Sequence, residues 1–250
     1  MKRVVGVLLV VLFLQVFAVV AVQAGEVRLS AAATLAEAMR EISALYEQKE
    51  PEVKVLPNFG ASGALARQIE QGAPVDLFVS ANRRWMEHLA AQGRMEEASQ
   101  GILASNKLVL VGRRDLENSS LEDLVRLERI AIVNPRSGPA GEYAEQALRA
   151  LGLYERLAPK LVMAQDVRQA VVYADRGEVA AALVYKTDAL LARQAKILYE
   201  VSPELHDEIA YPLALTVSGA GNPAAVAFLA FLQGPEARQV LEKYGFLVAP

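Results

Sequence analysis

The most informative segment of this sequence is Gly60–Met86, which reads GASGALARQIEQGAPVDLFVSANRRWM. It begins with a turn of small residues, Gly60–Gly63, and continues into a helical pattern at Ala64–Gln71. Asp76–Ser80 (DLFVS) is an apolar strand, and a second helical pattern follows it at Arg83–Gln92. Strands separated by helices in this way are typical of parallel α/β sheets.

The same alternation extends over most of the chain. Further strands are expected at Glu26–Ala32, Val53–Leu56, Lys107–Val111, Arg129–Val133, Leu161–Ala164, Val179–Tyr185, Lys196–Glu200 and Ala210–Ser218. About ten strands are many for one sheet, so the sequence predicts two lobes, each a mainly parallel sheet flanked by helices. No Pro/Gly/Ser-rich linker separates them, which favours two crossover strands, Asn106–Gly112 and Ala210–Ser218. Lobe 1 is then expected at residues 25–105 and 213–250, and lobe 2 at residues 106–212.

The first residues indicate export. Lys2 and Arg3 precede an apolar run from Val4 to Val22, and small residues at Val22 and Ala24 form a cleavage site. We expect residues 1–24 to be a signal peptide that is cleaved after about Ala24, leaving a periplasmic protein. An uncleaved membrane anchor is the alternative, because ~18 apolar residues can span a bilayer. The chain has no cysteine, so neither a lipid-anchored cysteine nor a disulfide is expected.

The charge of the chain argues against nucleic acid as a partner. The formal net charge is −3, and it moves to −5 when residues 1–24 are removed, because that segment carries two positive charges and no negative ones. An acidic exported protein is poorly suited to nucleic acid or to anionic membrane surfaces.

Four turns share one design, in which a strand ends, small or hydroxyl residues follow, and a helix begins. They are Ala31–Leu35, Asn58–Leu65, Asn134–Gly141 and Gln165–Arg168. The first N–H groups of a helix lack intrahelical partners, and the helix dipole adds about half a positive charge there. Several such ends facing one cleft would bind a small anion without a cationic side chain. Hydroxyl residues at these positions can equally be simple N-caps, worth ~1 kcal/mol each.

Motifs along the chain make one family resemblance specific. In addition to Gly60–Met86, they are AAATLAEAM from Ala31, NPRSGPAGEYAEQAL from Asn134, AQDVRQAV from Ala164, ALVYKTDAL from Ala182 and GPEARQVLEKYGF from Gly234. In this order the sequence resembles the periplasmic molybdate-binding proteins of ABC importers, from about Val27 to Phe246. The resemblance implies the two-lobed fold of type II periplasmic binding proteins, and we expect a monomer.

The resemblance also implies the groups that bind the oxyanion. Hydroxyl donors would come from Thr34, Ser62 and Tyr185, and backbone N–H donors from Ala140 and Val167. The metal would be bound only as its oxyanion, with no direct cation ligand and no cofactor. Two positions depart from the family pattern: Thr34 replaces its usual serine, and Gly63 stands where some relatives carry serine.

Other polar residues receive ordinary interpretations. Arg168 is expected to face solvent or to pair with a carboxylate, and His88 and His206 are expected on the surface. None of the five implied ligands titrates near neutrality, which predicts an affinity that is nearly independent of pH from about 6 to 9.

The function expected is capture of molybdate or tungstate between the lobes and delivery to the membrane subunits of an ABC importer. Sulfate or phosphate is the alternative ligand. An enzyme with Ser62 as nucleophile is disfavoured, because Ser62 is not in a G-x-S-x-G turn and neither histidine follows a strand. The effector domain of a transcription regulator is disfavoured by the export signal.

Overall fold

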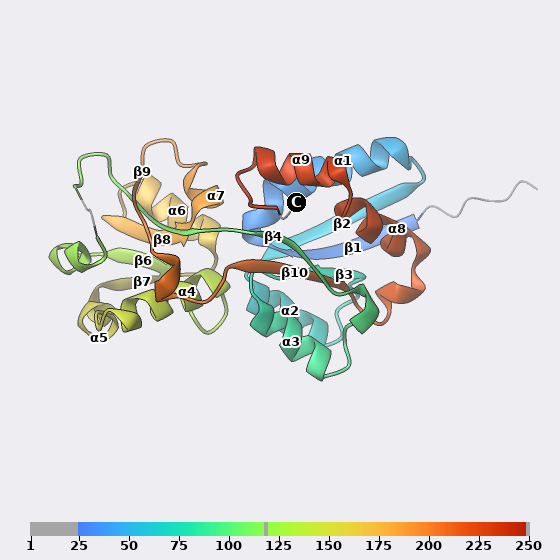
Figure 1. Ribbon diagram of the computed structural model, residues 1–250, viewed down its shortest axis with the longest axis horizontal. Coiled ribbons are helices and arrows are strands. Elements are labelled where there is room, and N and C mark those ends of the chain that lie inside the picture. Colours follow the sequence, from blue (N-terminus) through green and yellow to red (C-terminus); the bar gives the residue numbers. More distant parts are fainter. Residues whose placement is uncertain (1–24, 118–119, 249–250) are drawn as a thin grey trace, which may run out of the picture.

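The computed structural model describes residues 25–117 and 120–248, so the predicted signal peptide lies outside the described residues. Two five-stranded sheets, each flanked by helices, form two lobes that lie side by side (Figure 1). The two-lobed α/β fold predicted from the sequence is confirmed. Over the described ranges, no helix has both the length and the hydropathy that crossing a membrane requires.

The first sheet has the strand order β2-β1-β3-β10-β4. Its strands are β1 (Gly25–Ala32), β2 (Val53–Gly60), β3 (Leu77–Val79), β4 (Gly101–Ser105) and β10 (Ala210–Leu215). Its helices are α1 (Ala36–Lys49), α2 (Ser62–Glu70), α3 (Arg83–Ala91), α8 (Pro223–Leu232) and α9 (Pro235–Lys243). The strand β4 was not predicted from the sequence.

The second sheet repeats this arrangement with the order β7-β6-β8-β5-β9. Its strands are β5 (Leu108–Gly112), β6 (Ile130–Val133), β7 (Leu161–Ala164), β8 (Ala181–Tyr185) and β9 (Lys196–Glu200). Its helices are α4 (Pro139–Ala150), α5 (Tyr154–Leu157), α6 (Val167–Asp175) and α7 (Lys186–Ala189).

Both sheets are mainly parallel, as the sequence predicted, and each contains one reversed strand. In the first sheet β1 pairs in parallel with β2 and β3, whereas β10 pairs antiparallel with β3 and β4. In the second, β6 pairs in parallel with β7 and β8, whereas β5 pairs antiparallel with β8 and β9. The strands β5 and β10 each follow a passage from the other lobe, so they enter their sheets in the reverse direction.

The passages between the lobes are short links. All of β5 pairs within the second sheet and all of β10 within the first, so the crossover strands predicted at Asn106–Gly112 and Ala210–Ser218 each lie mainly in one lobe. The links are Asn106–Lys107 and residues 201–209, which include a 3-10 turn at Pro203–Leu205. The chain thus rejoins the first sheet at Ala210, close to the end of lobe 2 that the sequence predicted at residue 212.

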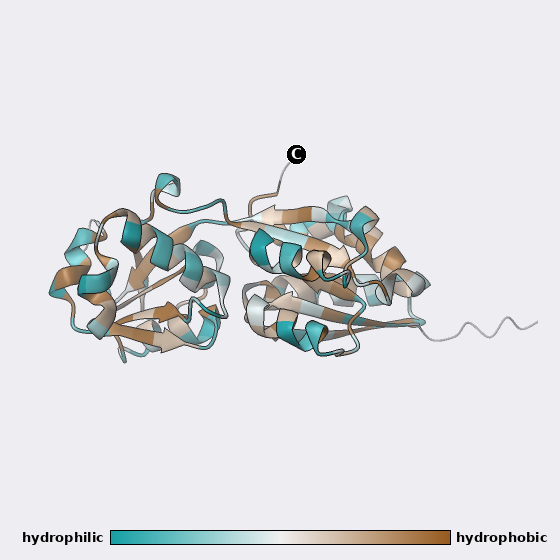
Figure 2. Ribbon diagram, turned by 90° about the horizontal axis from the view of Figure 1, so that it is seen from below, coloured by the Kyte–Doolittle hydropathy of each residue, from teal (hydrophilic) through white to brown (hydrophobic). Residues whose placement is uncertain are grey.

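Each lobe buries its sheet between helices. All five residues of β8 and the apolar part of β5 are buried, with Leu108–Val111 fully inaccessible. Hydrophobic residues follow the strands while hydrophilic residues gather on the outward helix surfaces (Figure 2). Burial on both faces explains the continuous apolar runs from which these strands were predicted.

Candidate functional site

A small cavity lies between the lobes, where β1 and β2 end on one side and β6, β7 and β8 end on the other. Its volume is about 20 Å³, and its lining includes all five residues that the sequence singled out: Thr34, Ser62, Ala140, Val167 and Tyr185. Each is at least 95% buried. The structure therefore brings together residues that are distant in the sequence, and their binding of an anion stays a prediction.

Three helix N-termini point their first turns at this cavity. Ser62 is the first residue of α2, Val167 is the first residue of α6, and Ala140 follows Pro139 at the start of α4. The N–H groups at these positions have no carbonyl four residues earlier in the same helix. Three positive dipole ends and their free N–H groups therefore converge on one point between the lobes.

The close approach of these turns depends on glycine. A Cβ atom at Gly141 would lie 2.0 Å from the carbonyl oxygen of Val133, so only glycine lets α4 begin directly against the end of β6. Gly63 lies where the lobes meet, and its N–H donates to the carbonyl of Ser137 at 2.8 Å. A Cβ at Gly63 would lie 2.5 Å from that same oxygen, so this departure from the family pattern allows close contact between the lobes.

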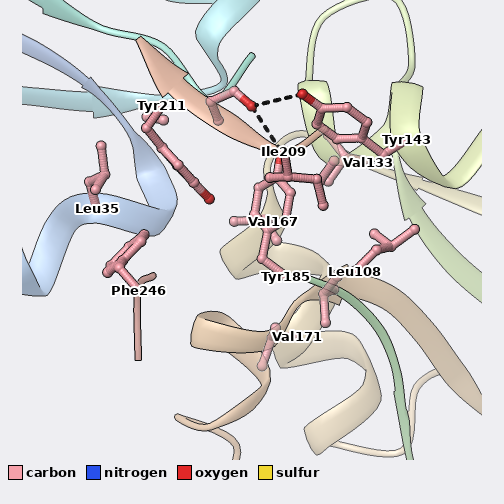
Figure 3. Close-up of a cluster of buried hydrophobic side chains, with 14 of the residues drawn as sticks. Leu35, Leu108, Val133, Tyr143, Val167, Val171, Tyr185, Ile209, Tyr211 and Phe246 are labelled. Atoms are coloured by element: carbon pink, nitrogen blue, oxygen red, sulfur yellow. Dashed lines mark hydrogen bonds between the residues drawn. The ribbon is translucent and has the colours of Figure 1, made fainter. Parts of the chain in front are cut away.

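Two of the hydroxyl groups are held by one backbone segment. Oγ of Ser62 accepts a hydrogen bond from the N–H of Ala81 at 2.9 Å, which leaves its own hydrogen free for a ligand. The phenol hydroxyl of Tyr185 donates to the carbonyl of Ala81 at 3.5 Å, and that of Tyr143 lies 3.5 Å from the same carbonyl and 3.1 Å from the carbonyl of Glu208 (Figure 3). Burial raises the pKa of Tyr185 well above its ordinary value, so this phenol stays neutral and keeps its one hydrogen, which points at Ala81 in this structure.

The third hydroxyl, on Thr34, lies in a polar cluster that the sequence did not predict. Its Oγ1 lies 3.1 Å from Oγ1 of Thr187 and forms a hydrogen bond to Oδ2 of Asp188. The side chain of Asn106 in turn donates to Oγ1 of Thr187 at 2.8 Å. Asp188 is completely buried, and burial raises its pKa to about 6 although the nearby Arg168 acts in the opposite direction. The sequence feature that could have indicated this cluster is the polar tripeptide KTD, which directly follows the apolar strand that ends at Tyr185.

Arg168 joins the lobes beside this cluster. It projects from α6 and forms ion pairs with Glu37 of α1 and, at 2.8 Å, with Asp188. It also donates to the carbonyls of Ala33 at 3.3 Å and Thr34 at 3.2 Å. The sequence predicted that Arg168 faces solvent or pairs with a carboxylate, and the structure shows ion pairs with Glu37 across the cleft and with Asp188 in its own lobe.

A second set of contacts closes the other side of the cleft. The amide of Asn82 donates to Glu142 at 2.9 Å, and Arg84 pairs with the same carboxylate at 3.1 Å. Asn82 and Arg84 belong to the first lobe and Glu142 to the second. The lobes are therefore closed around the cavity, with polar contacts on both sides of it.

Replacing Arg168 with alanine should weaken ligand binding about tenfold or more, although Arg168 does not line the cavity. The substitution removes four contacts between the lobes or with Asp188, so the closed form becomes less populated. Arg40→Ala is the matched control, because Arg40 also pairs with Glu37, at 3.6 Å, yet is exposed. Calorimetric titration and small-angle scattering would measure affinity and closure. Wild-type affinity in Arg168→Ala would contradict this role.

The cavity offers donors to an anion and no site for a bare cation. Across residues 25–117 and 120–248, no group of three or more His, Cys, Asp or Glu side chains is placed to hold a metal ion. The lining residues are small, apolar or hydroxyl-bearing, apart from Asp166, whose carboxylate accepts from the N–H of Gln169 as a helix cap. Such donors suit the oxygen atoms of an oxyanion.

Comparison with known proteins places this geometry in a family. The family model described as "Bacterial extracellular solute-binding protein" matches residues 27–247. The chain is 35% identical over 232 residues to the molybdate-binding protein ModA of Escherichia coli, covering 90% of each chain. It is 37% identical over 220 residues to the putative ABC transporter substrate-binding lipoprotein YvgL of Bacillus subtilis, covering 87% of this chain and 85% of that one. The solved periplasmic molybdate-binding protein of Azotobacter vinelandii matches with a TM-score of 0.80 and 25% identity, over 90% of this chain and 100% of that one.

Proposed function

This chain belongs to the bacterial extracellular solute-binding proteins, and from that premise we propose that it captures molybdate or tungstate between its lobes for an ABC importer. It is a transport component and not an enzyme. The anion is its cargo, and no cofactor takes part. Delivery to the membrane subunits of the importer follows from the family, and we propose that the protein acts as a monomer.

The observation that carries this proposal is the convergence of neutral donors on one buried cavity. Three helix N-termini supply N–H groups, and Thr34, Ser62 and Tyr185 supply hydroxyls. A tetrahedral dianion has four oxygens that accept hydrogen bonds in different directions, which a cage of donors from both lobes satisfies. The metal atom is enclosed by its own oxygens, so the protein binds oxygen and none of these residues is a metal ligand.

The cellular location that we propose for the protein rests on the same family membership. We propose that residues 1–24 direct export and are removed after about Ala24, so that the protein acts in the periplasm. One of the relatives is named a lipoprotein, but this sequence contains no cysteine to carry a lipid. We therefore propose a mature protein without a lipid anchor.

Calorimetric titration of the mature protein with molybdate, tungstate, sulfate and phosphate tests the proposal. Molybdate and tungstate should bind one per chain, and sulfate at least ~100-fold more weakly, because fixed donors cannot move inward to a smaller anion and buried donors would be left unpaired. If sulfate or phosphate bound as tightly as molybdate, the ligand proposed here would be wrong and the protein would be a binding protein for another oxyanion. Absence of binding for all four anions would reject it.

A further inference from the structure

The contact between Thr34 and Asp188 limits which hydrogens are available at the site. Oγ1 of Thr34 and Oδ2 of Asp188 lie within hydrogen-bond reach of each other, and both are buried. Two oxygens in such contact need one hydrogen between them, and a threonine hydroxyl has only one to give. If Asp188 is ionised, that hydrogen must come from Thr34.

An anion in the cavity needs the same hydrogen. Thr34 lines the cavity, so an oxyanion there would accept its O–H, which leaves two electron-rich oxygens facing each other at Asp188. Alternatively the Thr34 hydroxyl keeps donating to Asp188, and Thr34 then presents only lone pairs to the dianion. Either arrangement is unfavourable for buried groups.

We propose that Asp188 takes up a proton from solvent when the anion binds, donates it in a hydrogen bond to Thr34, and so positions the Thr34 hydroxyl to donate to the anion. This inference rests on the proposed function of the same cavity. It makes Asp188 a positioning residue that acts through Thr34 and does not line the cavity itself. No covalent bond changes, and one proton moves from water to Oδ2.

The surroundings of Asp188 support its protonation. Oδ1 lies 2.8 Å from Nε of Arg168, but Nε directs its hydrogen at the carbonyl of Ala33, and Oδ1 has no hydrogen-bond partner among the described residues. Within residues 25–117 and 120–248, the hydrogen bonds of Oδ2 are those with the hydroxyls of Thr34 and Thr187, the latter at 3.4 Å. A completely buried carboxylate with so few donors is poorly stabilised in its charged form.

The other charged or titratable groups around Asp188 are few. Arg168 of α6 favours its ionised form, whereas Glu37 of α1, which shares that arginine, disfavours it. Tyr185 of β8 and Tyr211 of β10 also face this region, and burial raises the pKa of both well above 10, so neither changes charge near neutrality. Glu200, at the end of β9, forms solvent-accessible ion pairs with Lys107 and with Lys186, the first residue of α7.

The sign of the pH dependence follows from these contacts. In the closed form without an anion, burial raises the pKa of Asp188 to about 6, and a neighbouring dianion raises it further, because like charges oppose ionisation. Binding above pH 6 therefore takes up a proton, and affinity falls as pH rises. The fall is about tenfold per pH unit until the pKa of the complex is reached. The pH-independent affinity predicted from the sequence omitted this group, and we replace it with this expectation.

The test is calorimetric titration of the full mature protein with molybdate from pH 6 to 9 at fixed ionic strength, in buffers of different ionisation enthalpy. Wild-type protein should take up close to one proton per anion at pH 7.5 to 8, a measurement that needs no variant. In Asp188→Asn the side-chain amide donates to Thr34 and does not titrate. The affinity of this variant for molybdate should therefore change by less than about twofold over this pH range and should exceed the wild-type affinity at pH 8.5. Thr34→Ser should keep the proton uptake and Thr34→Val should lose it.

Glu142 is the necessary second control, because burial also raises its pKa and it joins the lobes on the other side of the cavity. Glu142→Gln should leave the proton uptake unchanged. Molybdate binding without proton uptake, or equal pH dependence in wild type and Asp188→Asn, would overturn the positioning role and leave the proposed function intact. Failure of molybdate to bind at any pH would reject the proposed function instead.

Discussion

Val167→Pro should weaken molybdate binding by about 1.5–3 kcal/mol, roughly 10- to 150-fold in Kd, while α6 remains folded. Val167 is the first residue of α6, and its N–H has no partner within the helix. Proline is well tolerated at this helical position. The preceding residue, Asp166, has φ −147° and ψ 176°, an extended conformation that a following proline favours. The substitution thus replaces one backbone donor in the cavity with a ring carbon.

The control is Val167→Ala, which shortens the same side chain and keeps the N–H group. Val167 is 5% exposed, so both variants lose similar packing. Circular dichroism would verify that both fold, and calorimetric titration would compare their affinities. If Val167→Pro bound molybdate as tightly as Val167→Ala, the N–H of Val167 would not be a ligand and the donor set proposed for α6 would be wrong.

Ser62→Ala should weaken binding by a similar amount, about 1.5–3 kcal/mol, because it removes a hydroxyl donor to a charged ligand. It should also lower the stability of the unliganded protein by about 1–3 kcal/mol. The reason is that the buried N–H of Ala81 donates to Oγ of Ser62 at 2.9 Å and would lose its acceptor. Both effects arise from one oxygen atom that is completely buried.

Ser43→Ala is the matched control for this experiment. Ser43 is also buried, lies on α1 away from the cavity lining, and its Oγ has no hydrogen-bond partner among the described residues. It should change neither affinity nor, by more than a few tenths of a kcal/mol, stability. Urea unfolding with and without molybdate separates the two effects of Ser62→Ala. A variant that is destabilised but binds normally would show that Ser62 only supports the loop at Ala81.

The sequence by itself determined the lobes and the helix starts that contact the cavity. These features are local: an apolar strand, a turn of small residues and an amphipathic helix follow each other within about 15 residues, so their pattern is visible without knowledge of distant contacts. The starts of α2, α4 and α6 lie near the turns predicted from Asn58, Asn134 and Gln165. The family resemblance then named five residues, and all five line one cavity.

Sheet direction and the ends of the lobes were harder to predict. Whether β5 and β10 run parallel or antiparallel to their neighbours depends on which lobe the chain has just left. The residues of these strands do not indicate the strand direction. The strand β4 was missed because Gly101–Ser105 is only partly apolar, and its pairing with β10 joins segments that are far apart in the chain.

Only the tertiary structure decided what surrounds Thr34. Thr34 and Asp188 are 154 positions apart, and the contact exists because two lobes close on each other. The same closure brings Arg168 to Glu37, 131 positions away. The helix starts could be predicted because they are local, and the family resemblance implied that their donors meet at one site. Whether those donors also meet a buried carboxylate is set by the packing of one lobe against the other, which also gives Asp188 its raised pKa.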